Sequence, residues 1–266
     1  MPKLKENVDL KGANNLALTK EQRILSKILR EEIKLFCEQN AKEVVIKKYS
    51  RYFKKNEYDA FGVEPTLINS KVKEILEKYK DELKLNGFLY LGDLLLKDGK
   101  YDEKSFALTF IDDKDLKKDY SINTFKHIGN WLDNYIDNWA HDDFLCSRII
   151  SYFIKEKIVD LKDFSNWRKA LSKWKRRAVP VSMINYLKKY GVKPEYLTFI
   201  EPLMIDNERV VHQGLGWFLR EAWKRDNDII ESFLFKWKNI SPRLIFQYAT
   251  EKMDPEKKKL FKKEKY

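Results

Sequence analysis

The sequence predicts an all-α protein in which antiparallel helix pairs stack into an α-solenoid. Composition is the first reason: 266 residues include only 9 Gly and 7 Pro, and Leu, Ile, Lys and Glu are abundant, which favours helix over sheet. Apolar residues also recur at helical spacing, with no convincing hairpin or alternating strand run. Finally, the helical segments are roughly ten to twenty residues long and joined by short links, which is typical of stacked helix pairs.

The first helix is expected to begin after Thr19, because "TKEQ" offers Thr19 as a cap and Gln22 as its reciprocal partner. "YDAFGVEPT" breaks the pattern with a glycine and a proline, and a helix then runs to about residue 84. In "SPRLIF", Ser241 is the expected cap of the last helix and Pro242 its first residue. The other expected helices cover residues 41–54, 87–97, 102–113, 119–136, 143–156, 165–189, 195–203, 208–224 and 228–238.

The chain is expected to form one HEAT-like domain over residues 19–252, between a flexible N-terminal arm (1–18) and a lysine-rich, solvated C-terminal tail (253–266). No crisp repeat is visible in the sequence. HEAT-like repeats diverge while keeping an apolar pattern, so the solenoid remains the preferred interpretation. An irregular helical bundle is the alternative.

Charge and cysteine usage narrow the function. The chain has 53 Lys+Arg against 41 Asp+Glu, a formal net charge of +12, which points to a polyanion and most plausibly to nucleic acid. Cys37 and Cys146 have neither disulfide nor metal-ligand spacing. The polar N-terminus is unlike a secretory signal and no apolar run reaches membrane-spanning length, so a cytoplasmic protein without cofactor or metal is expected.

The densest basic segment is "WRKALSKWKRR", residues 167–177. Trp167 and Trp174 would share one face if the helix were continuous, and clustered cations favour contact with phosphates. The alternative is a helix with solvated lysines and two buried tryptophans. No acid interrupts the six cations, which are Arg168, Lys169, Lys173, Lys175, Arg176 and Arg177.

A second pattern is "DNWAHDDFLCS", residues 137–147, where Trp139 and Asp143 fall on one helical face with Asp142 beside them. An indole and a carboxylate together suit a positively charged, electron-poor substrate. The alternative is that Asp143 simply caps a helix before "FLCSRII".

A third pattern is "VVHQGLGWFLREAWK", residues 210–224. Gly214 and Gly216 cost helix propensity, which makes sense if another backbone or a ligand approaches closely. Arg220 can share the face of Trp217. The alternative is that the glycines permit tight helix packing and Trp217 is buried.

Together, "WAHDD", "WKRR" and "GLGWFLREAWK", preceded by "RYFKKNEYDAFGVEPTLI", resemble the DNA alkylation repair family of HEAT-like glycosylases, the AlkD-like proteins. The resemblance spans roughly residues 25–250. It implies a curved stack of helix pairs with a basic concave face for duplex DNA. It also implies excision of cationic alkylated purines such as 3-methyladenine and 7-methylguanine, the first step of base excision repair.

By this resemblance, Trp139, Asp143, Arg177 and Trp217 line the lesion site, and Arg176 and Arg220 accompany them. Lys173 and Lys175 extend the DNA-binding segment. The expected protein is a monomeric, monofunctional DNA glycosylase acting on duplex DNA. Because the two acids are adjacent, the sequence leaves open whether Asp142 or Asp143 is the catalytic carboxylate. Two readings compete: a non-catalytic HEAT-like module that recognises DNA by shape and charge, and a protein-interaction solenoid.

Overall fold

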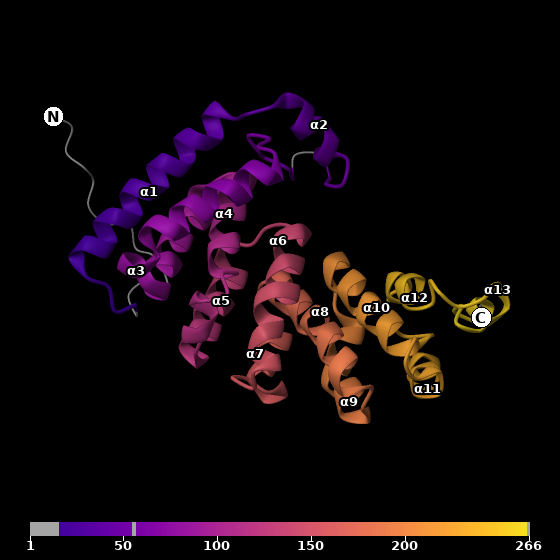
Figure 1. Cartoon of the computed structure of the whole chain (residues 1–266). Coiled ribbons are helices and arrows are strands. Elements are labelled where there is room, and N and C mark those ends of the chain that lie inside the picture. The colour runs from indigo at the N-terminus through magenta and orange to yellow at the C-terminus, as the bar shows by residue number, and fades with distance from the viewer. Residues whose placement is uncertain (1–15, 55–56, 265–266) are drawn as a thin grey trace. The chain divides into compact units, whose positions relative to one another are not determined.

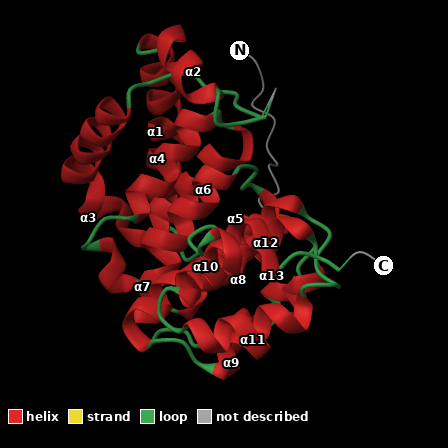
Figure 2. Ribbon diagram, turned by 90° about the vertical axis from the view of Figure 1, so that its right-hand side faces the viewer, coloured by secondary structure: helices red, strands yellow, loops and turns green. Residues whose placement is uncertain are grey.

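A computed structural model describes residues 16–54 and 57–264, and every regular element within these ranges is helical (Figures 1 and 2). The predicted all-α class is therefore confirmed. None of the described helices is both long and apolar enough to cross a membrane. The chain divides into two compact units, one ending at Tyr135 and the other beginning at Ile136. A single domain over residues 19–252 stays a prediction.

The first unit packs a long kinked helix between its neighbours. α3 lies against α1 and α4 and turns at Lys84, whose φ is 51°, at the residue where the sequence predicts a helix to end. Thr19 caps α1 as predicted: its Oγ1 accepts from the backbone N–H of Gln22 at 3.2 Å, and its own N–H donates to the Gln22 side chain at 3.1 Å. The helices are α1 (Lys20–Gln39), α2 (Glu43–Ser50), α3 (Pro65–Asp98), α4 (Tyr101–Ile111) and α5 (Ile122–Asn134).

The expected N-terminal arm lies outside the described residues up to position 15. Of its last residues, Leu16 and Leu18 are partly buried against Tyr90, and the carbonyl of Ala17 accepts from Asn86 Nδ2 at 3.2 Å. These contacts fix the end of the arm to the first unit.

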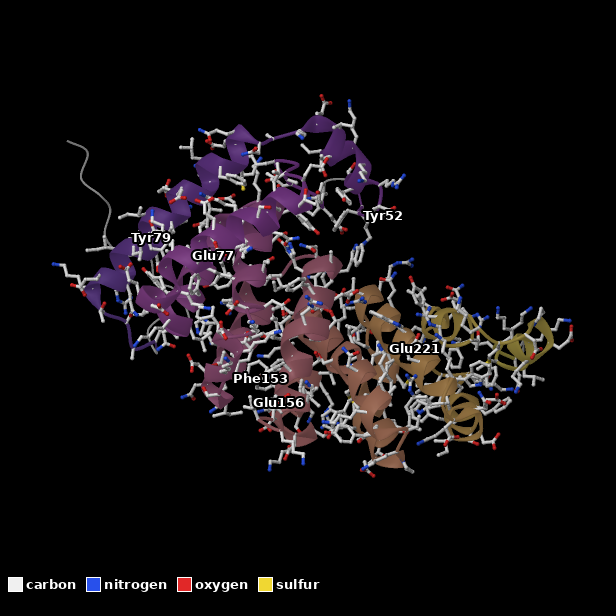
Figure 3. All side chains as sticks on the ribbon, viewed as in Figure 1. Tyr52, Glu77, Tyr79, Phe153, Glu156 and Glu221 are labelled. Atoms are coloured by element: carbon white, nitrogen blue, oxygen red, sulfur yellow. The ribbon has the colours of Figure 1, made fainter. Side chains whose placement is uncertain are left out.

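The second unit is a series of shorter helices. The segment from residue 139 to 155 is helical throughout, with a π-helical turn over Leu145–Ile150 between α6 and α7. Phe153 on α7, labelled in Figure 3, is fully buried in this unit. The helices are α6 (Trp139–Phe144), α7 (Ser151–Lys155), α8 (Lys173–Tyr190), α9 (Pro194–Ile200), α10 (Arg209–Trp223), α11 (Asn227–Trp237), α12 (Arg243–Ala249) and α13 (Pro255–Leu260).

Three local expectations in the second unit are wrong. The helix expected over 165–189 is broken: a 3-10 turn at Trp167–Lys169 is followed by extended residues, and α8 begins at Lys173. Ser241 does not cap α12, which begins at Arg243. Nor is the C-terminal segment a frayed extension, because it forms α13, and the buried Phe261 accepts a hydrogen bond from Arg243 Nη1 at 3.1 Å.

Hydrogen bonds between the α6–α7 segment and α8 join residues that are 32 to 38 positions apart in the sequence. Arg177 binds Asp143, and Lys189 binds the carbonyl of Lys155, both 34 residues apart. Arg177 also binds the carbonyl of Val210, 33 residues away. Because residue numbers rise together along the α6–α7 segment and α8, these helices run in the same direction. Equivalent helices of successive repeats stack in this way, so the unit has the α-solenoid construction that the sequence predicts.

Candidate active site

The two candidate acids lie inside α6 rather than at its start. Asn138 caps this helix, since its Oδ1 accepts from the backbone N–H of His141 at 3.0 Å. The alternative that Asp143 is the cap is therefore wrong. Asp142 is completely buried, whereas 22% of the Asp143 side chain is exposed. Trp139, one helical turn before Asp143 on the same face, is 40% exposed.

Arg177 on α8 binds both acids. Its Nη2 donates to Asp143 Oδ1 at 2.8 Å and Oδ2 at 3.1 Å, and its Nε lies 3.2 Å from Asp143 Oδ1. The same Nε is 3.1 Å from Asp142 Oδ2, and Nη1 donates to the carbonyl of Val210 at 2.7 Å. A buried guanidinium bonded along its whole edge has one orientation available. It therefore fixes the position of Asp143.

The two carboxyl groups differ in how well their charge is compensated. Burial raises the pKa of Asp143, and the charge of Arg177 opposes this shift. The pKa of Asp142 is raised well above its ordinary value, first by complete burial and then by the charge of Asp143, with Arg177 again opposing. Asp142 Oδ1 is also buried without a hydrogen-bond partner among the described residues, which disfavours the charged form. Asp143, with both oxygens bound by Arg177, is thus the better placed of the two to carry the negative charge.

A glycine on α10 makes room for Arg177. A Cβ added at Gly214 would lie 3.0 Å from Arg177 Cγ and 3.0 Å from Val181 Cγ2, so the bare backbone lets α8 and α10 approach side by side (Figure 1). Trp217 follows Gly214 by three residues on the same side of α10 and is half-buried. The three sequence patterns therefore meet around one arginine.

Gly216 serves packing on another face of α10. A Cβ there would lie 2.5 Å from Tyr248 Cβ and 2.6 Å from the carbonyl oxygen of Ile245, both on α12. The sequence suggested that a backbone or a ligand approaches these glycines closely. The structure shows other parts of the protein there: side chains of α8 at Gly214 and the backbone of α12 at Gly216.

Two of the candidate DNA-binding arginines are engaged within the protein. Arg176 Nε and Nη2 donate to Asp206 at 2.6 and 3.2 Å, a partner that the sequence did not suggest. Arg220 Nε donates at 3.2 Å to Glu221, labelled on α10 in Figure 3, and its Nη1 binds Glu251. These arginines hold helices and loops together.

The lysines of the basic segment lie over tryptophan rings. Lys173 Nζ is 5.5 Å from the centre of Trp174 and Lys175 Nζ is 5.4 Å from that of Trp167. Both tryptophans are buried, and the break before α8 means that they do not share one continuous helical face. The structure agrees with the buried-tryptophan interpretation of this segment, and both lysines are partly buried against these rings.

Chemically, the site offers an oriented carboxylate, partly open to solvent, with an exposed indole one turn away. Such a group can stabilise positive charge that develops on a substrate, because the carboxylate needs no reorganisation as the charge appears. Among residues 16–54 and 57–264, no three His, Cys, Asp or Glu side chains are arranged to hold a metal ion.

Comparison with known proteins adds the family. The model of the family described as DNA alkylation repair enzyme matches residues 34–253, a range that includes all of the site residues. Among solved structures, a predicted DNA alkylation repair enzyme from Enterococcus faecalis is similar, with a TM-score of 0.67 and 14% identity over 81% of this chain and 98% of that chain. At this identity the likeness supports the fold. No curated protein matches the sequence.

Proposed function

Because the chain belongs to the DNA alkylation repair enzyme family, we propose that it is a monofunctional DNA glycosylase for cationic alkylated purines in duplex DNA. Its products would be free 3-methyladenine or 7-methylguanine and an abasic site. The observation that carries the proposal is the partly exposed Asp143 carboxylate, held by Arg177 with Trp139 one turn away on the same face.

The reaction needs little from the protein besides charge and position. A purine alkylated at N3 or N7 is a cation, so it leaves as a neutral molecule with the electron pair of the glycosidic bond. The anomeric carbon then gains positive charge, which Asp143 would stabilise. A water adds to this carbon and its proton passes to solvent. No acid is needed to protonate the leaving base, and no lysine is needed as a nucleophile.

The aromatic residues would recognise the cation. The face of an indole carries negative potential, which attracts a positively charged base or sugar. Trp139 is exposed enough to meet a ligand, and Trp217 is half-buried on α10, one turn after the Gly214 that lies against Arg177. In this proposal Arg177 acts by positioning Asp143, and phosphate contacts come from lysines such as Lys173 and Lys175.

The test is release of bases from methylated duplex DNA, followed by chromatography of the free bases. We expect 7-methylguanine and 3-methyladenine to be released, and expect no uracil from a matched uracil-containing duplex, because uracil would leave as an anion. Salt-sensitive binding without any release would instead support the non-catalytic DNA-binding module. Absence of salt-sensitive binding would support a protein-interaction solenoid.

A further inference from the structure

The first unit contains a polar pocket with a volume of about 710 Å³. It opens between the second half of α3, the start of α5 and the residues that precede α1 (Figure 1). Its lining residues all lie between Leu16 and Asn130, whereas Asp143 and Arg177 belong to the second unit. A pocket of this volume can hold a small molecule of nucleotide size. The proposed glycosylase reaction does not use it.

A buried histidine lines this pocket. His127 on α5 is 6% exposed, and its Nε2 lies 2.9 Å from Asp93 Oδ1. A carboxylate only accepts hydrogen bonds, so Nε2 carries the proton, and in the neutral ring Nδ1 is then an acceptor. Nδ1 forms no hydrogen bond within the described residues and is not fully enclosed, so it is open toward the pocket. A hydroxyl group of a ligand would supply the missing donor.

The ring of His127 is held in one orientation. Asp93, on the second half of α3, is 2% exposed and also accepts from Trp131 Nε1 at 2.6 Å. The indole of Trp131 lies edge-on to the imidazole, with ring centres 5.6 Å apart. The direction of Nδ1 is therefore fixed before a ligand binds, which lowers the entropy cost of binding.

Two lysines bring positive charge to the pocket. Lys84 and Lys126 line it, are exposed, and form no ion pair within the described residues. Asp119 is the one acid among the described residues that line the pocket, so positive charge is in excess. The first turn of α5 also borders the pocket through Ser121 and Asn123, and the start of a helix favours an anion. These groups suit a phosphate.

The backbone of Lys84 has a conformation that lysine rarely adopts. Its φ is 51° and its ψ is −173°, close to a region that is occupied almost only by glycine. The kink interrupts the hydrogen bonds of α3, and the carbonyls of Glu82 and Leu83 accept instead from Gln22 Nε2 at 2.8 and 3.1 Å. Because glycine would make this turn without steric cost, the lysine indicates a role for its side chain outside the fold.

We propose that this pocket binds a nucleoside monophosphate. Lys84 and Lys126 bind the phosphate, His127 Nδ1 accepts a hydrogen bond from a hydroxyl of the sugar, and the buried Leu85 and Leu89 form an apolar wall for the base. A free nucleotide and the 5′-phosphorylated end of a nucleic-acid strand both carry this group.

Calorimetric titration of the full chain with adenosine monophosphate and with adenosine tests the phosphate contact. We expect adenosine monophosphate to bind, and adenosine to bind at least about tenfold more weakly, because it lacks the charged group that the lysines contact. Equal affinity for the two ligands, or no binding of the monophosphate, would overturn the proposal.

The contact with His127 is tested on the ligand, because a His127 variant would also leave the buried Asp93 without its partner. The ligand 2′,3′-dideoxyadenosine monophosphate keeps the phosphate and the base but has no hydroxyl on C2′ or C3′ of the sugar. We expect it to bind about fivefold to tenfold more weakly than adenosine monophosphate. Equal affinity for these two would remove His127 from the site.

Substitutions test whether the measured binding occurs in this pocket. Lys126→Gln is expected to weaken binding of adenosine monophosphate about tenfold. Lys84→Gly is expected to do the same without lowering the melting temperature, because glycine accepts this backbone conformation. Lys97→Gln is the matched control, since Lys97 is exposed at the other end of the same half of α3 and does not line the pocket. Equal affinity in the wild type, Lys84→Gly and Lys126→Gln would overturn the proposal.

The source of the phosphate is decided with a short single-stranded oligonucleotide, with and without a 5′-phosphate. Tighter binding of the phosphorylated strand than of adenosine monophosphate, lost in Lys126→Gln, assigns the pocket to a strand end. No effect of the 5′-phosphate, with adenosine monophosphate bound, assigns it to the free nucleotide.

Discussion

Arg177 grips Asp143 by both carboxylate oxygens, with Nη2 at 2.8 and 3.1 Å, while its Nε also touches the buried Asp142 at 3.1 Å. One buried guanidinium therefore forms ion pairs with two carboxyl groups that differ in exposure. The acid whose oxygens are both bound and partly reached by solvent is the one suited to act on a substrate. The fully buried acid is suited to hold the cation in place.

The two acids can be distinguished by parallel substitutions. Asp143→Asn removes the charge proposed to stabilise the sugar cation, and we expect base release to fall by about a hundredfold or more. Asp142→Asn keeps an oxygen that can accept from Arg177 Nε, and should retain most of the activity. Single-turnover release from methylated duplex DNA measures both. DNA affinity, measured alongside, should change little in Asp143→Asn, and the reverse ranking of the two variants would assign the working role to Asp142.

The pH dependence of release follows from the ionisation of Asp143. Burial raises the pKa of this carboxyl, and only the ionised form can stabilise a cation. Release should therefore fall as pH falls through the raised pKa, with the acid limb above about pH 4, where an ordinary aspartate titrates. A profile that stays flat down to that pH would show that no carboxylate with a raised pKa takes part.

The pH dependence of the melting temperature should show whether the buried Asp142 carboxyl is protonated in the folded protein. A carboxyl whose pKa is raised on folding contributes stability that is fully present below its unfolded pKa and is lost as pH rises through the folded value. The pKa of Asp142 is raised well above its ordinary range, by burial first. The melting temperature of Asp142→Asn relative to wild type is thus expected to improve as pH rises from about 4 to about 8. A difference that is constant or shrinks over this range would mean that the buried acid is ionised throughout.

The two glycines of α10 should respond differently to the same substitution. Gly216→Ala places a Cβ against the backbone of α12, which cannot move cheaply, and should destabilise the protein by about 1–3 kcal/mol. In Gly214→Ala the added carbon presses on Arg177 and Val181, so it should disturb the orientation of Asp143 and lower base release more than Gly216→Ala does. Thermal melting and release rates on both variants compare these effects. Equal losses of activity at equal stability would argue against a positioning role for Arg177.

Substituting a cation that contacts DNA phosphate should have a different effect from substituting one that forms an ion pair within the protein. Lys173 has no ion pair within the described chain, so Lys173→Gln should reduce the salt slope of DNA binding by about one unit with little change in melting temperature. Arg176 is bound to Asp206 and to two loop carbonyls. Arg176→Gln should therefore mainly lower the melting temperature, with a smaller effect on the salt slope of DNA binding. Titrations at several salt concentrations, with melting curves, would separate the two roles, and an unchanged slope for Lys173→Gln would place phosphate contact elsewhere.

Much of the local structure is encoded in short stretches of sequence. The Thr19–Gln22 box predicts the start of α1, and the helix expected to end near residue 84 does turn at Lys84. The predictions fail where a local sequence signal is overridden by packing against distant residues. Ser241 looks like a cap, yet it is completely buried in the turn before α12. The C-terminal segment looks frayed, yet Asp254 caps α13 there and Phe261 is buried.

The sequence by itself determined the helical class, because the apolar period is a property of the chain. Its motifs also carried the family resemblance, and that resemblance supplied the candidate set Trp139, Asp143, Arg177 and Trp217. Only the tertiary structure decided the pairing: that Arg177 binds both acids, that Asp206 takes Arg176, and that Leu171 is left in solvent. The stacking of α8 between α6 and α10 also emerged only in space, through contacts of Arg177 with residues 33 and 34 positions away. A helical pattern specifies which face is apolar, but a charged side chain finds its partner only when stacked helices bring distant residues together.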